Sequence, residues 1–161
     1  MIQADDFRRV TGCFATGVTV TTFPGDDPHG LTVNAFSSVS LDPPLVQVCI
    51  DNNTTSYDLL ETEGVEAYCV NILASDQKEL GEYFANMTDT DESPFETEST
   101  RIAETGAKIF EGSLGFVDCS IWKAVPAGDH TIYIGKVEEC EILNPEKISL
   151  TFFKGEWGKL S

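Results

Sequence analysis

The stretch GLTVNAFSSVSLDPP, residues 30–44, sets single apolar residues between small polar ones and ends in two prolines. Its spacing predicts a strand with Thr32 and Asn34 on one face and aliphatic residues on the other. Such a polar face is ordinary on a solvated sheet. Its hydroxyls and amides, followed by Ser37 and Ser38, equally suit the carbonyls and nitrogens of a flat heterocycle, or a phosphate. The residues alone leave both interpretations open.

Alternating and short apolar runs continue on both sides of this stretch and predict a mainly β chain. We expect strands at 18–23, 31–36, 45–51, 66–73, 115–125, 128–143 and 148–157, and helices at 4–14, 55–64 and 75–86. Gly135 marks an expected bulge. Residues 87–100 are rich in Asp and Glu and show no periodicity, which predicts a mobile loop. Short turns between antiparallel-type strands indicate a small β-barrel, and residues 1–161 one domain.

Charge is the strongest compositional signal, with 10 Lys plus Arg against 27 Asp plus Glu and a net charge of −17. Such a surface repels nucleic acid and anionic lipid, so we expect neither as a partner. The acidic residues are spread along the whole chain, which favours a halophilic source. No apolar run is long enough to span a bilayer, so we expect a soluble, cytoplasmic protein. Five widely spaced cysteines indicate reduced thiols rather than a disulfide framework.

Motifs of several enzyme classes are missing. The sequence has no GxGxxG after a strand, no GK[ST], no HExxH and no GxSxG. Only His29 and His130 are present, so we expect no metal site. The stretch DNNTTS, 51–56, offers helix caps or a phosphate site, and the two interpretations stay open. His130, beside Asp129, is an ordinary turn residue or a group that positions a substrate.

Five segments, in order, resemble the flavin reductase family with the FMN-binding split barrel, the reductase components of two-component flavin monooxygenases. They are FRRVTGCFATGVTVTT (7–22), HGLTVNAFSSVSLDPPLVQVCID (29–51), YCVNILASDQKELGEYFA (68–85), GDHTIYIGKV (128–137) and FFKGEWG (152–158). The resemblance covers nearly the whole chain. It implies a six-stranded antiparallel Greek-key split barrel with flanking helices, a homodimer with flavin near the subunit interface, and a monooxygenase component as partner.

The resemblance also assigns residues to the flavin, which is FMN or, alternatively, FAD. The isoalloxazine and ribityl chain would lie along Thr32, Asn34, Ala35, Phe36, Ser37 and Ser38, and the ribityl phosphate along Asp51, Asn52, Asn53 and Thr54. Phe84 and Ala85 match a Phe-Ala pair near the flavin. The nicotinamide of NADH or NADPH would lie against His130, Phe153 and Gly155.

The implied reaction passes hydride from the nicotinamide to the flavin, with the protein supplying proximity and orientation and His130 positioning the nicotinamide. One departure is that Asn52 and Asn53 stand where many relatives have Lys or Arg near the phosphate. A flavoredoxin-like electron carrier is the main alternative. A related barrel that binds heme or a deazaflavin is disfavoured by the NAFSSVSLDPP pattern.

Overall fold

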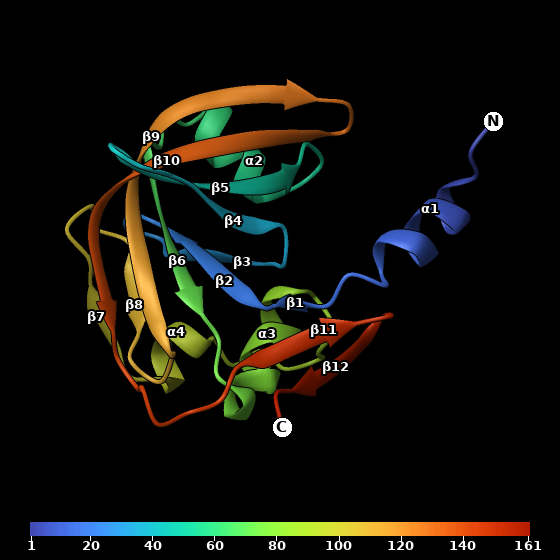
Figure 1. Cartoon of the computed structure of the whole chain (residues 1–161). Helices are drawn as coiled ribbons and strands as arrows, with labels where there is room; N and C mark the ends of the chain where they lie inside the picture. Colours follow the sequence, from blue (N-terminus) through green and yellow to red (C-terminus); the bar gives the residue numbers. More distant parts are fainter.

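Seven antiparallel strands form the main sheet of the computed structural model, which describes residues 1–161 (Figure 1). In sheet order they are β3 (His29–Val33), β2 (Thr19–Phe23), β6 (Ala67–Ile72), β9 (Gly115–Ala127), β10 (His130–Ile142), β5 (Pro44–Asp51) and β4 (Phe36–Leu41). Two small sheets flank it. One joins β1 (Thr16–Gly17), β11 (Leu150–Phe153) and β12 (Glu156–Lys159), and the other pairs β7 (Thr100–Ile102) with β8 (Lys108–Phe110).

The two edge strands of the main sheet, β3 and β4, follow each other directly in the chain. Only Asn34 and Ala35 join them, so Val33 and Phe36 are at most about 11 Å apart, three Cα–Cα steps of 3.8 Å. The sheet must therefore curl until its edges meet. They meet without a ladder, and the hydrogen bond from Cys49 N to Ala35 O, 3.1 Å long, only extends the β4–β5 pairing by one residue.

The core explains why a central strand carries threonine. Every residue of β2 is buried because both faces of this strand are covered. Two of the three threonine hydroxyls are satisfied by backbone: Thr19 Oγ1 donates to Val33 O and Thr22 Oγ1 to Lys108 O, each over 2.6 Å, whereas the buried Thr21 Oγ1 has no partner. A buried hydroxyl with such a partner avoids most of the cost of leaving water.

Four helices and a 3₁₀ turn complete the chain. They are α1 (Ala4–Thr11), α2 (Thr55–Glu61), η1 (Ser75–Gln77), α3 (Lys78–Phe84) and α4 (Pro94–Thr97). Helix α1 extends away from the sheets in Figure 1 and buries no residue. Its apolar side chains Phe7 and Val10, and Phe14 just beyond it, are at least 60% exposed. Eight residues are too few for a stable isolated helix in water.

The structure confirms a mainly β chain with flanking helices and the bulge at Gly135, where the β10–β9 register shifts. A six-stranded closed barrel is not confirmed, since the main sheet has seven strands and no pairing closes it. The prediction of a single strand at 148–157 is wrong, because a turn through Lys154 and Gly155, both with positive φ, divides the segment into β11 and β12. Residues 87–100 are not loop alone, since they contain α4. No helix has the length and apolar character to cross a bilayer.

Candidate functional site

Two cavities open on either side of the β3 edge. The α2 cavity, about 540 Å³, lies between the start of α2 and the segment that follows α3. The β4 cavity, about 870 Å³, lies where the sheet fails to close. Gly30 and Leu31 line the first and Asn34 to Ser37 the second, so three residues of extended chain, roughly 10 Å, separate them. One elongated ligand could reach both.

The β4 cavity combines aromatic side chains with uncharged hydrogen-bonding groups. Phe14, Phe36 and Phe152 contribute rings, and Asn34, Ser37 and Gln47 contribute amides and a hydroxyl. Gln47 Nε2 donates to Ser37 Oγ over 3.1 Å, which fixes part of this polar edge. Arg8 is the only cation in the lining. Rings with a few amides and hydroxyls suit a flat, nitrogen-rich heterocycle.

Cys49 also lines the β4 cavity, and burial raises the pKa of its thiol. The group therefore stays protonated near neutral pH and is no activated nucleophile. Thr16, on the same wall, has a buried Oγ1 with no partner in the protein.

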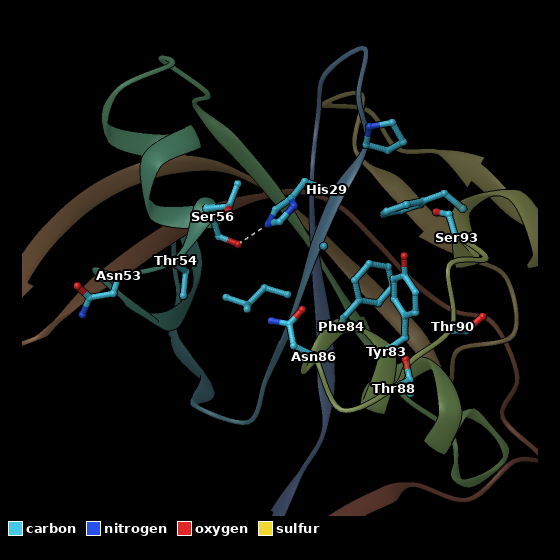
Figure 2. A pocket seen from close by; sticks show the side chains of 15 residues that line it. His29, Asn53, Thr54, Ser56, Tyr83, Phe84, Asn86, Thr88, Thr90 and Ser93 are labelled. Atoms are coloured by element: carbon cyan, nitrogen blue, oxygen red, sulfur yellow. Dashed lines mark hydrogen bonds between the residues drawn. The ribbon is translucent and has the colours of Figure 1, made fainter.

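The α2 cavity is lined by hydroxyls and amides from two separate parts of the chain (Figure 2). One wall carries Asn53 to Ser56 and His29, and the facing wall carries Asn86, Thr88, Thr90 and Ser93. The rings of Tyr83 and Phe84 lie between the walls. No Lys or Arg lines it.

His29 is held by a hydrogen bond of 2.9 Å between its Nε2 and Ser56 Oγ, drawn dashed in Figure 2. Its ring also packs against Phe23, with centroids 5.8 Å apart. Burial lowers the pKa of His29, with a smaller opposing effect from Asp27. The imidazole is therefore neutral at pH 7, and the α2 cavity carries no positive charge.

The structure places eight of the residues predicted from the sequence in these cavities. Asn34, Ala35, Phe36, Ser37 and Gly155 line the β4 cavity, and Asn53, Thr54 and Phe84 line the α2 cavity. The Thr54 hydroxyl also caps α2, accepting from Tyr57 N over 3.3 Å. The structural and ligand-binding interpretations of DNNTTS are thus compatible at this residue.

Other predicted residues do not line either cavity. Thr32 Oγ1 donates to Gly81 O over 2.6 Å, so this hydroxyl ties β3 to α3. Asp51 Oδ1 accepts from Asn53 N, and Asn52 Oδ1 accepts from Thr131 Oγ1, both over 2.8 Å. The rest of the set is Ser38, Ala85, His130 and Phe153.

His130 begins β10 at the tip of the β9–β10 hairpin, paired with Asp51 of β5. Its side chain is 43% exposed, and its Nδ1 lies 2.8 Å from Asp129 Oδ1. This hydrogen bond lowers the pKa of Asp129, and the charge of Arg8 acts in the same direction. The Asp129 carboxylate can therefore hold the imidazole orientation while the other ring nitrogen stays available. Phe153 is 44% exposed on β11.

Sequence reasoning missed the second wall of the α2 cavity, which comes from the supposed loop. Its signal was the alternation Thr88-Asp89-Thr90-Asp91, a period of two that sends successive side chains to opposite sides. The His29–Ser56 pair joins residues 27 positions apart, and no local pattern predicts it. No cluster of three or more His, Cys, Asp or Glu side chains could hold a metal ion.

Known proteins share both this sequence and this architecture. The family model described as "Flavin reductase like domain" matches residues 11–161. The flavin-dependent monooxygenase reductase subunit HsaB of Mycobacterium tuberculosis is 35% identical over 158 residues, 97% of this chain and 82% of that protein. An NADH-dependent FAD reductase of Streptomyces globisporus is 36% identical over 132 residues, 81% of this chain and 71% of that protein.

The solved structure of the flavin reductase PheA2 in its native state aligns with a TM-score of 0.89 at 35% identity, covering 99% of both chains. Sequence and fold agree over nearly the full length, and the matched region contains every residue of both cavities except Arg8. The chain therefore belongs to the flavin reductase-like domain family.

Proposed function

We propose that this protein is an NADH-dependent flavin reductase that supplies reduced flavin to a monooxygenase component. The observation that carries the proposal is the pair of cavities on the β3 edge. The β4 cavity offers aromatic rings together with amide and hydroxyl groups. The α2 cavity offers a run of neutral hydroxyls and lies within one ribityl-chain length of the β4 cavity along β3. Relatives named NADH-dependent FAD reductase and monooxygenase reductase subunit support the reaction class.

The residues present fit a flavin, FMN or FAD. Phe36 would pack on the isoalloxazine while Asn34 and Ser37 hydrogen-bond its edge, and Asn53 and Thr54 would bind the tail. The bound flavin accepts a hydride from the nicotinamide. The protein's own part is to exclude water, orient the ring plane and leave one face open to the second substrate.

His130 is proposed to position the nicotinamide, with Asp129 fixing the imidazole. Phe153 and Gly155 would border the same site. Neither Phe153 nor His130 lines a cavity of the single chain. A homodimer would supply the missing wall, because α1 carries the unpartnered apolar face of Phe7 and Val10 and stands next to the β4 cavity through Arg8.

The first experiment is an absorbance spectrum of protein purified in molar KCl, followed by NADH oxidation with and without added FMN. NADH consumption that rises with added FMN supports a flavin reductase. Bound flavin that NADH does not reduce would instead identify a flavoredoxin-like electron carrier. Protein that binds no flavin at any salt concentration would contradict the proposal.

We further propose a cytoplasmic protein adapted to high salt, because 27 acidic residues face only 10 basic ones and all five cysteines are free. Scarce cations also favour NADH over NADPH, which carries an extra phosphate. Stability should rise as KCl increases from about 0.1 M, where the Debye length is about 10 Å, toward molar concentrations. Unfolding midpoints that do not change with KCl would contradict the salt adaptation.

A further inference from the structure

The segment after α3 is held in place at both ends. Asn86 has φ of 57°, a left-handed conformation that asparagine tolerates, and Met87 N donates to Glu82 O to end the helix. At the far end, the Phe95 ring lies edge-on to Phe84 and stacked on Phe110, each at 5.3 Å. The chain between these anchors borders the α2 cavity and forms one of its walls.

This wall presents neutral groups to the cavity and carboxylates elsewhere. Thr88, Thr90 and Ser93 line the cavity, whereas Asp89 and Asp91 do not. No protein group is hydrogen-bonded to the Thr88 hydroxyl, and Thr90 Oγ1 accepts only from Glu92 N, 3.2 Å away. These hydroxyls can both donate to and accept from a ligand.

The opposite wall is neutral as well. Asn53 and Ser56 are uncharged, and burial lowers the pKa of His29, so its imidazole carries no charge at pH 7. A phosphate in this cavity would meet no lysine or arginine side chain, and Asp89 and Asp91 adjoin the lining residues Thr88 and Thr90 in a chain of net charge −17. A polyhydroxyl chain would find hydrogen-bond partners on both sides and lose nothing to charge repulsion.

We infer that the wall formed by Asn86, Thr88, Thr90 and Ser93 makes the protein select flavins by the charge of their tails: it favours the uncharged ribityl chain of riboflavin over the phosphorylated tails of FMN and FAD. This inference rests on the proposed flavin reductase function. The preference weakens as salt screens the carboxylates, because screening acts on the phosphate and leaves the neutral chain unaffected.

The test measures flavin binding directly, through the quenching of flavin fluorescence, in 0.1, 0.5 and 2 M KCl. Circular dichroism checks at each concentration that the protein is folded. At the lowest concentration that keeps the protein folded, riboflavin should bind more tightly than FMN by about two-fold, from two charge pairs about 10 Å apart in water with a Debye length of about 10 Å. The two dissociation constants should converge in 2 M KCl. FMN binding that equals or exceeds riboflavin binding at the lowest salt would overturn the inference.

Two variants test the Thr88 hydroxyl and the Asp89 and Asp91 carboxylates separately. Thr88→Val keeps the shape and removes the hydroxyl, so riboflavin binding should weaken by about five-fold. The matched control is Thr62→Val, an exposed threonine outside both cavities, which should bind as the wild type does. The double variant Asp89→Asn, Asp91→Asn should tighten FMN binding about two-fold at the lowest salt and leave riboflavin binding unchanged.

The outcomes distinguish this inference from the proposed function. Wild-type protein that binds no flavin contradicts the function itself. Wild-type protein that binds flavin, while Thr88→Val binds riboflavin equally well and the charge variant leaves FMN binding unchanged, overturns only the role of the wall.

Discussion

Replacing Gly30 by alanine tests how β3, α3 and the α2 cavity depend on one another. A Cβ on Gly30 would lie 2.7 Å from Cε1 and 2.9 Å from Cδ1 of Phe84. These separations are shorter than carbon atoms adopt, so the ring or the strand must move. Phe84 is 6% exposed and packed against Phe95 and Phe110, with centroids 5.3 and 5.8 Å away, so it has little room to retreat.

Overpacking of this kind costs about 1–3 kcal/mol. Alanine also restricts the unfolded chain, which returns about 0.4–1 kcal/mol. We therefore expect Gly30→Ala to lower the free energy of unfolding by about 1–2 kcal/mol, which for a domain of this size lowers Tm by about 2–8 °C. Because Phe84 lines the α2 cavity, the dissociation constant for flavin should rise too.

The assay is urea unfolding of the two single variants Gly30→Ala and Phe84→Leu and of their double variant, in molar KCl. Leucine is smaller than the ring, so the double variant should be less destabilised than the sum of the singles, with a coupling of about 1 kcal/mol. Gly17→Ala is the matched control, since its Cβ would meet only Ser149 Oγ at 3.8 Å. Wild-type stability for Gly30→Ala, or effects that simply add, would refute the packing argument.

Three further predictions concern titration and substrate binding. Burial lowers the pKa of His29 below its unfolded value, so the unfolded state takes up more protons and the wild-type free energy of unfolding should fall from pH 7 to 5. In urea unfolding, His29→Gln should lose this dependence of stability on pH. Burial raises the pKa of Asp118 despite two hydrogen bonds from Thr105, so the folded state keeps this proton to a higher pH than the unfolded state does. The stability of the wild type relative to Asp118→Asn, measured by thermal unfolding, should therefore fall as the pH rises from below 4 to 7. His130→Ala should raise KM for NADH more than it weakens flavin binding, and an unchanged KM would remove His130 from the site.

The sequence predicted the strands β2, β5, β6, β9 and β10 from alternating or short apolar runs, whereas the strand predicted at 31–36 is wrong because residues 34–35 separate β3 from β4. The run 45–51 is buried at alternate positions in β5, and Gly135 makes the bulge that leaves room for Tyr68, whose hydroxyl a Cβ would meet at 2.5 Å. The pairings that bring distant residues together were not predictable from local pattern. Thr32 Oγ1 donates to Gly81 O, for example, and only the docking of α3 on β3 decides that hydrogen bond.

The open edge of the sheet explains how a chain with so few cations can bind a flavin. Edge strands leave backbone N–H and C=O groups unpaired, and these must find partners in a ligand, in water or in another chain. Here the two edge strands, β3 and β4, are joined through Asn34 and Ala35, which line the β4 cavity. Backbone donors of this kind carry no net charge, so binding by them does not depend on lysine or arginine and persists in molar salt, where charge-based recognition of phosphate is screened. An acidic surface and a flavin site are thus compatible, because in the proposed site the ligand contacts neutral groups of an unclosed sheet and of the wall that faces α2.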